Sequence, residues 1–278
     1  TEQATDHFDT RLWSSDVVNP AAGQKQISLD FQPDWVWSKN RDNAENHYWM
    51  DSVRGDNVGN KWLRSNSTAA EGADAVSSTT AKYDFTSTGF DIIDTNSASG
   101  EVYYNNGSAS TPRTYVGWCW KAGTSVSGTT TGSGTGQAYT GSVNTDAGFS
   151  IIAYTGNGTA GHTIPHHLGV APRVVITKKR SSTGSWGTYH AGLTSASYYI
   201  LLNDTAAEAS NNVYFNGTAP TDSVVTRVYP ANSTPEFGSL PYKNQIIITS
   251  GAISAGKYDF IPNVIKKFKL KSFFKGVA

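Results

Sequence analysis

Three histidines in one short segment are the first candidates for chemistry in this sequence. His162, His166 and His167 follow one another closely, but no cysteine or carboxylate is near them in the chain. A zinc site needs three or four ligands that converge with a defined geometry. We therefore expect ordinary loop histidines and no bound metal, with a metal on the symmetry axis of an oligomer as the alternative.

A glycine-rich segment matches the pattern of a dinucleotide-binding loop. Gly156–Gly161 reads G-N-G-T-A-G and follows a strand-like segment. A dinucleotide site also needs a helix directly after the loop and an acidic residue about 20 residues further on. Here His162–Pro165 follows, which is no helix start, and the distant position holds Lys178 and Lys179. We therefore interpret the segment as a turn and expect no cofactor.

Carboxylates give no pattern typical of a hydrolase. They are scattered singly, for example Asp91 and Asp94 or Glu45 and Asp51, and no G-x-S-x-G motif occurs. Cleavage of a glycosidic bond needs two carboxyl groups that flank the substrate. The fold could assemble such a pair, so a polysaccharide depolymerase stays the third-ranked function, but we expect no enzyme and no catalytic residues.

The chain has eight tryptophans, whose rings could stack on sugars. Trp35 and Trp37 share one face of a predicted strand, and aliphatic residues replace both in a second copy of this segment described below, which predicts core positions. Polar or charged residues surround Trp49 and Trp62. These two rings are therefore the better candidates for contact with a surface ligand, although a buried or half-buried position is the first expectation for both.

Basic residues occur at 178–180 and near the C-terminus, but the formal net charge is zero, with 22 basic and 22 acidic residues. Proteins that bind nucleic acid through phosphate contacts usually carry a net positive charge, so we expect no nucleic-acid partner. In the C-terminal tail, Phe268 and Leu270 alternate with Lys267, Lys269 and Lys271. This alternation predicts a strand that docks on another subunit by strand addition.

Two long strings of the sequence occur twice. Leu63–Glu71 is echoed by Ile200–Glu208, and Phe31–Arg41 is echoed by Val170–Arg180. The step along the chain from Pro33 to Pro172 is nearly the same as the step from Glu71 to Glu208. We call the first of these steps the proline offset and the second, which is slightly shorter, the glutamate offset. A duplication of this length predicts two similar domains rather than a short-period solenoid.

The elements that must position these residues are short, aromatic and β-branched segments bounded by Gly, Asn, Ser or Pro, which are typical of strands. The sequence predicts an all-β protein of two antiparallel β-sandwich, jelly-roll-like domains. The expected parts are a first copy at 1–121, a Gly/Ser/Thr-rich flexible linker at 122–146, a second copy at 147–230, and a divergent strand and basic tail at 231–278. The best helix candidates are single turns with capping boxes, Thr68 with Glu71 and Thr205 with Glu208.

Composition indicates a polar but weakly charged surface. Charged residues are only 16% of the chain, below the usual quarter, and Gly, Ser, Thr and Asn take their place. The single cysteine, Cys119, lies between two tryptophans and is expected to be a buried, inert thiol. No apolar run is long enough to span a membrane, and the N-terminus lacks the pattern of a signal peptide. We therefore expect no membrane insertion.

Several strings recur together in one known family. They are Phe31–Arg41, Met50–Gly55, Asn66–Glu71, Tyr115–Gly123, Phe149–Gly158 and His167–Pro172. As a set, they resemble a repeat domain of large virion proteins in marine tailed phages, cyanophages above all. The resemblance covers about residues 8–230, and it implies a phage structural protein of the tail-fibre type with no catalytic residues to carry over. The chain departs from the family after Pro230, where the second aromatic strand does not follow.

These observations lead to a ranked expectation for function. First comes a tail fibre or adhesion appendage of a virion, assembled in the host cytoplasm as a homo-oligomer that contacts other virion subunits and a host-surface glycan. The alternative is a head decoration protein that clamps capsid subunits.

Overall fold

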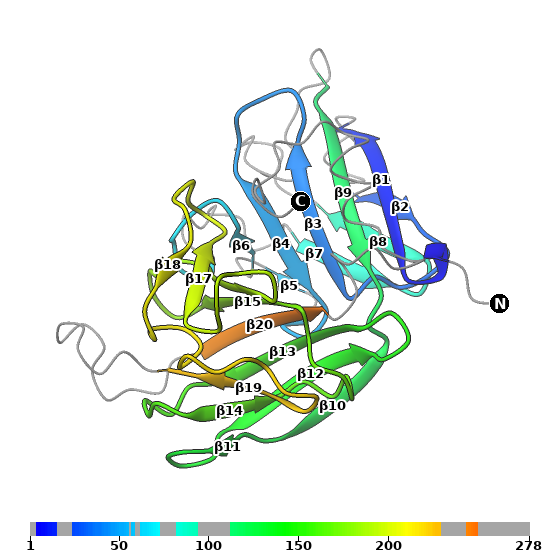
Figure 1. Cartoon of the computed structure of the whole chain (residues 1–278). Helices are drawn as coiled ribbons and strands as arrows, with labels where there is room; N and C mark the ends of the chain where they lie inside the picture. Colours follow the sequence, from blue (N-terminus) through cyan, green and yellow to red (C-terminus); the bar gives the residue numbers. More distant parts are fainter. Residues whose placement is uncertain are drawn as a thin grey trace. The chain divides into compact units, whose positions relative to one another are not determined.

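The computed structural model describes residues 4–15, 24–55, 57–58, 62–72, 82–93, 112–228 and 243–249. Within these residues the chain is all-β, which confirms the predicted class: its strands pair into antiparallel sheets, and the one helical element is a 3-10 turn at Ala4–Asp6 (Figure 1). No helix of this described part has the length and apolar character to cross a membrane. The chain divides into two compact units, unit 1 at Thr1–Gly123 and unit 2 at Thr124–Ala278.

Unit 1 contains two sheets. The five-stranded sheet has the order β1 (Phe8–Ser14), β9 (Thr114–Trp120), β3 (Trp35–Asn40), β4 (His47–Asp51) and β6 (Leu63–Arg64). The four-stranded sheet has the order β2 (Gln24–Ser28), β8 (Gly89–Ile93), β7 (Lys82–Thr86) and β5 (Asn57–Val58). One hydrophobic core draws side chains from both sheets, among them Trp13, Val36 and Tyr115 from the first and Ile27 and Phe90 from the second. This is a sandwich-like arrangement.

Aromatic and β-branched residues make β3 and β9 strands, because such side chains pack well on a pleated surface. Their register sets Trp37 opposite Trp118, and Val36 opposite Cys119. Gly117 interrupts the bulky residues of β9 for a steric reason: a Cβ at this position would lie 2.9 Å from the Trp13 ring. The glycine therefore lets the Trp13 ring approach the strand closely.

Unit 2 contains an eight-stranded and a three-stranded sheet. The larger has the order β10 (Thr124–Thr129), β12 (Ala138–Asn144), β13 (Phe149–Thr155), β20 (Lys243–Thr249), β15 (Val174–Lys179), β16 (Gly187–His190), β17 (Tyr198–Leu201) and β18 (Ala209–Ser210). The smaller has the order β11 (Thr131–Gly132), β14 (His162–Pro165) and β19 (Val224–Arg227). The core again joins both sheets, with Ile152, Val175 and Tyr189 from the larger and Ile164 and Val225 from the smaller.

The predicted flexible linker at 122–146 is wrong. These residues form β10, β11 and β12, and β12 pairs with β13 along its whole length, from Tyr139–Tyr154 to Asn144–Phe149. The reason is that threonine and serine fit a pleated strand when apolar residues alternate with them, and Tyr139 and Val143 enter the core of unit 2. Unit 2 therefore begins at Thr124 rather than near 147.

The predicted strand at Gln245–Thr249 is confirmed as β20, but its place corrects the expectation of a separate C-terminal segment. The backbone of β20 pairs with β13 on one side and with β15 on the other, so it lies inside the larger sheet of unit 2. A strand inserted between two others belongs to the fold rather than to a docking tail. The tail residues Lys267, Phe268, Lys269, Leu270 and Lys271 lie outside the described residues.

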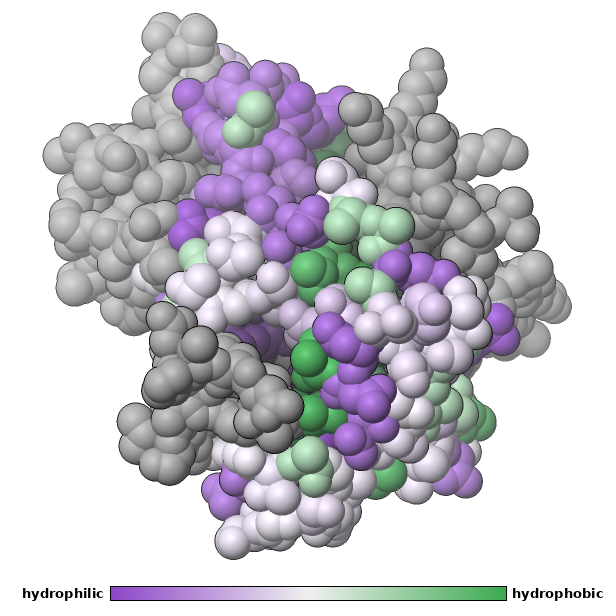
Figure 2. Space-filling model, turned by 60° about the vertical axis from the view of Figure 1, so that its left-hand side comes forward, coloured by the Kyte–Doolittle hydropathy of each residue, from purple (hydrophilic) through white to green (hydrophobic). Residues whose placement is uncertain are grey.

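The described surface is mainly polar. On the face that Figure 2 shows, hydrophilic and neutral residues predominate and hydrophobic residues form smaller groups. Leu12 and Val170, 53% and 52% exposed, are the large hydrophobic side chains that stand out to solvent in the described part.

Candidate functional site

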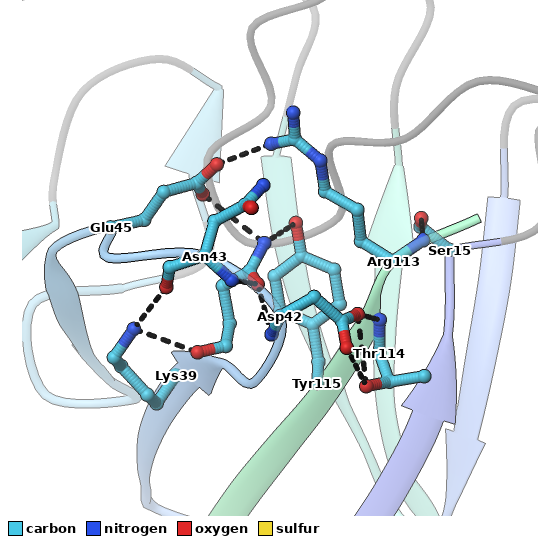
Figure 3. Close-up of polar contacts among 9 residues, drawn as sticks. Ser15, Lys39, Asp42, Asn43, Glu45, Arg113, Thr114 and Tyr115 are labelled. Atoms are coloured by element: carbon cyan, nitrogen blue, oxygen red, sulfur yellow. Dashed lines mark hydrogen bonds and ion pairs between the residues drawn. The ribbon is translucent and has the colours of Figure 1, made fainter. Parts of the chain in front are cut away.

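The loop between β3 and β4 contains Asp42, Asn43 and Glu45 (Figure 3) and is organised by one buried asparagine, Asn40. Asn40 is 2% exposed, and its Oδ1 accepts the backbone N–H groups of Asp42 and Asn43, both at 2.9 Å. Its Nδ2 donates to the hydroxyl of Tyr115 at 3.1 Å and to Glu45 Oε2 at 3.3 Å. The two acceptor bonds are those of an Asx turn, so the side chain fixes the start of the loop.

Carboxylates tie the same loop to the start of β9. The Asp42 carboxylate accepts from both the backbone N–H and the hydroxyl of Thr114. The backbone hydrogen bond from Thr114 lowers the pKa of Asp42, because it stabilises the ionised form. Glu45 forms an ion pair with Arg113. We call these residues, together with Lys39 and Asn40, the loop cluster of unit 1.

A lysine closes the corresponding loop in each unit. Lys39 Nζ donates to the carbonyl of the next residue at 2.7 Å and to that of Asn43 at 2.9 Å. Lys178, which follows Lys39 at the proline offset, donates to the carbonyl of the next residue and to that of Gly184, both at 2.9 Å. Burial lowers the pKa of both lysines, to about 8 for Lys178, because the ammonium ion loses hydration.

In each unit, an asparagine side chain also bonds to the backbone at the start of the strand that follows the lysine loop, β4 in unit 1 and β16 in unit 2. Asn66 Oδ1 accepts the backbone N–H of His47 at 2.9 Å, and Asn203 Oδ1 accepts that of Trp186 at 2.7 Å. The residue before each asparagine donates its backbone N–H to the carbonyl of the same His47 or Trp186, at 3.0 and 3.1 Å. The asparagines are separated by the glutamate offset and their partners by the proline offset, so the braces follow the repeated strings.

The repeated glutamates also tie loops together, which corrects the prediction of helical turns with capping boxes at Thr68 and Thr205. Neither segment is helical. The Glu71 carboxylate accepts from Arg54 Nη1 at 3.0 Å, and the Glu208 carboxylate accepts from the backbone and hydroxyl of Thr194. Both carboxylates are thus used by the neighbouring loop and not by a helix end.

Arg54 completes this brace in unit 1. Its side chain is 1% exposed and forms an ion pair with the equally buried Asp51, besides the one with Glu71. Its Nη2 also donates to the carbonyl of Trp49 at 3.0 Å. A buried guanidinium needs such partners, because an unpaired buried charge is strongly unfavourable.

The contacts of the loop cluster make a well-ordered loop. Hydrogen bonds and ion pairs engage its carboxylates, its amide and its lysine. The tip of the loop, residues 41–44, is exposed and contains the charged residues Arg41 and Asp42.

A family model described as a domain of unknown function (DUF7483) matches residues 3–241. The chain belongs to the DUF7483 family. The match covers nearly all of unit 1 and continues through unit 2 to just before β20, so one DUF7483 match includes parts of both units. Comparison with the curated proteins and with the solved structures found no match.

The three clustered histidines of this DUF7483 domain turn to different partners. His162 Nε2 lies 2.5 Å from the hydroxyl of Thr130, and His167 Nε2 lies 2.8 Å from the hydroxyl of Tyr139. His166 Nε2 donates to a backbone carbonyl at 3.2 Å while its Nδ1 accepts a backbone N–H, which fixes a neutral tautomer. Burial lowers the pKa of all three. In the described part of the chain, no three metal-ligating side chains gather closely enough to hold an ion.

The glycine-rich segment is a turn between two strands, as predicted. It follows β13 and leads into β14. Asn157 Nδ2 donates to the carbonyls of Ser133 and Thr135 at 2.8 and 3.0 Å, and its Oδ1 accepts the N–H of Thr159 at 3.0 Å. The segment therefore holds the β11–β12 loop through Asn157.

The two tryptophans proposed for ligand contact are not exposed. Trp49 is 1% and Trp62 6% exposed. The Trp49 ring packs edge-on against Trp35 at 4.6 Å and against Trp37 at 5.5 Å. The first expectation, a buried position, is therefore confirmed, and the alternative of surface contact is wrong. The charged neighbour Asp51 does not bring Trp49 to the surface, because Asp51 is buried too and forms an internal ion pair.

Trp35 is buried as predicted, whereas Trp37 is only half-buried, and neither belongs to the core between the sheets. It stacks on Trp120 at 4.0 Å, and Trp37 contacts Trp118 at 5.5 Å. These rings lie outside the hydrophobic core that joins the two sheets of unit 1. Sequence reasoning also missed Lys39, Asn40 and Arg54, although the return of a lysine at the proline offset from Lys39 was a signal available in the repeat.

Proposed function

We propose that this DUF7483 protein is a non-enzymatic structural protein of a phage virion. Our first choice is a tail fibre or adhesion appendage. The proposal starts from the resemblance of its strings to virion proteins of marine tailed phages. An all-β fold with a polar, weakly charged surface supports it. Present in many copies, weak sites for a host-surface glycan would sum to firm attachment.

We infer further that the two units arose by duplication of one module. Supporting this, unit 1 has the strand order β1-β9-β3-β4-β6 and unit 2 contains the run β13-β20-β15-β16-β17. Trp35 lies opposite Asp51 in unit 1, and Val174 lies opposite His190 in unit 2. The proline offset leads from Trp35 to Val174 and equally from Asp51 to His190. By this correspondence, β20 stands where unit 1 has its aromatic strand β9.

The observation that carries the proposal is a repeated set of loop contacts that hold two different loop tips. The hydrogen bonds of the lysine and of the asparagine recur in both units, and each repeated glutamate also bonds to a neighbouring loop. The tips begin alike, with Arg41 and Arg180, but the charged Asp42 of unit 1 is replaced by Ser181 in unit 2. A rigid scaffold with varied loops is the usual design of binding modules.

Immunogold labelling of the particle tests the location. Label on the tail supports the appendage, whereas label over the capsid shell supports the alternative, a head decoration protein. Finding the protein only in host lysate and never on particles contradicts a virion protein of either kind. Release of polysaccharide by the purified protein contradicts the non-enzymatic part of the proposal and favours a depolymerase.

A matched pair of variants tests the loop tip. Arg41→Ala removes an exposed charge from the tip, and Arg173→Ala removes one from an exposed position of unit 2 away from the corresponding loop. We expect weaker binding of the purified protein to host cells for Arg41→Ala only. Equal binding by both variants and the unchanged protein contradicts a role for the unit 1 tip.

A further inference from the structure

Strand β10 forms an open edge of the larger sheet in unit 2. Its register with β12 runs from Thr124–Val143 to Thr129–Ala138 without a bulge. No described strand pairs with its other side (Figure 1). An edge strand of this kind presents backbone N–H and carbonyl groups that a further strand can bond.

The side chains of β10 leave this edge accessible. Five of its six residues are exposed, and only Val126 is partly buried, against the core of unit 2. Since successive side chains alternate, Ser125, Ser127 and Thr129 point to the opposite face from Val126. The strand therefore offers one small apolar contact on the core side and hydroxyl groups on the other.

Other edge strands in the described part of the chain are guarded by charge. In β1, Asp9 Oδ1 accepts the backbone N–H of Thr10 at 2.7 Å, and Arg11 Nε donates to the carbonyl of Ser28 at 2.7 Å. Strands β2 and β19 carry Lys25 and Arg227. Among the described edge strands longer than two residues, only β10 lacks a charged residue. Charges are a usual means of preventing edge-to-edge pairing, so their absence here leaves pairing open.

The sheet of unit 2 already extends on this side. Strand β12 covers the edge of β13, and β10 in turn covers β12, whereas β1 of unit 1 has no such covering strand among the described residues. A further antiparallel strand would continue this growth in the same direction. The larger sheet of unit 2 therefore ends at an edge strand without charged residues, to which a further strand can be added.

We propose that β10 pairs antiparallel with β10 of a second copy across a two-fold axis, which joins two unit 2 sheets into one. Opposite residues of an antiparallel pair share a face, so a symmetric register can set Val126 opposite Val126 and Ser125 opposite Ser127. The uncharged strand does not repel its copy, and Ser–Ser pairs across strands are favourable. A six-residue edge buries little area, so the contact is weak in solution and gains strength between copies held on a particle.

Sedimentation velocity of the full chain tests this inference by a charge swap. We expect a concentration-dependent dimer for the unchanged protein and a monomer for Ser125→Lys/Ser127→Lys, because like charges then lie opposite one another. Ser125→Glu/Ser127→Glu should also be monomeric, and an equal mixture of the two variants should dimerise again. Recovery on mixing separates loss of pairing from loss of folding.

The matched control is Thr205→Lys/Ala206→Lys, which adds the same charge to an exposed loop of unit 2 and should dimerise like the unchanged protein. A monomer at every concentration of the unchanged protein overturns the proposal. So does a dimer that persists in the Ser125→Lys/Ser127→Lys variant, or a mixture that stays monomeric.

Discussion

Acidification should destabilise unit 2 more steeply than unit 1. His162, His166 and His190 are 0–3% exposed, and burial lowers the pKa of each below 6.5. In unit 1, burial, aided by the positive charge of Lys39, lowers the pKa of His47 to about 4. Each folded-state pKa lies below the unfolded value, so the unfolded chain takes up protons first. Stability that is present above pH 6.5 is therefore lost as the pH falls.

The size of the effect follows from the number of buried histidines. Each one costs about 1.4 kcal/mol for every pH unit that separates its unfolded pKa from its lowered folded-state pKa, and the loss ends at the folded-state pKa. Just below pH 6.5, three such groups act in unit 2 and one in unit 1, so the loss begins about three times as steeply in unit 2. Such losses matter because domains are stable by only roughly 5–15 kcal/mol.

Hydrogen exchange measured by mass spectrometry at pH 7 and pH 5, corrected for intrinsic exchange rates, separates the two units. Peptides from β13 to β15 should lose protection before those from β3 and β4. His190→Asn keeps an acceptor for the N–H of Gly192, which His190 Nδ1 accepts at 2.9 Å, but removes one titrating group. It should reduce the acid sensitivity of unit 2, because one of the three buried titrating groups is gone. Equal protection of both units from pH 7 to pH 5 would refute the reasoning.

Three further predictions concern single side chains. Asn66→Ala and Asn203→Ala should each cost about 1 kcal/mol and expose the amide that each asparagine accepts to hydrogen exchange, whereas the Asp variants keep the acceptor and the protection. The folded-state pKa of Lys178 is lowered to about 8, so the free energy of unfolding should rise between pH 8 and 10.5. Lys178→Met should reduce that rise and leave the part due to Lys39, whose pKa is also lowered by burial; a rise of unchanged size in the variant contradicts the assignment. Burial raises the pKa of the Cys119 thiol, so a thiol reagent should label it only after unfolding, and rapid labelling of the folded protein speaks against this.

Local pattern was sufficient to predict the strands, because β-branched and aromatic residues bounded by turn residues indicate strands wherever they occur. The segments Trp35–Asn40, Phe149–Thr155 and Lys243–Thr249 follow this rule. The glycine-rich turn at 156–161 was also predictable, because no helix could follow it. These are properties of short stretches of chain, which do not depend on partners far away in sequence.

What the sequence did not reveal depends on partners distant in the chain. Residues 122–146 have the composition of a flexible linker, and only their pairing with β13, through β12, makes them part of a sheet. Trp49 was a candidate for surface contact because its neighbour Asp51 is charged. The ion pair between Asp51 and Arg54 explains how Asp51 can be buried beside it. Glu71 reads as part of a helix cap until the same Arg54 takes its carboxylate. In each case a tertiary contact overrides a local preference.

The repeated strings illustrate both outcomes. Their spacing indicated two related modules, yet the roles of their residues became visible only through hydrogen bonds across loops. Asn66 and Asn203 are exposed or half-buried polar residues that resemble surface positions in the sequence. The structure gives them the same task, the acceptance of one strand amide in each unit.

An experimentally determined structure of the full chain tests the central claim of one module used twice. When residues 31–71 are superposed on residues 170–208, we expect Lys39 to coincide with Lys178, each bonded to the carbonyl of the next residue, and Asn66 to coincide with Asn203, each bonded to the backbone N–H of His47 or Trp186. Halves that fail to superpose, or braces that bond to unrelated groups in the two units, would contradict it.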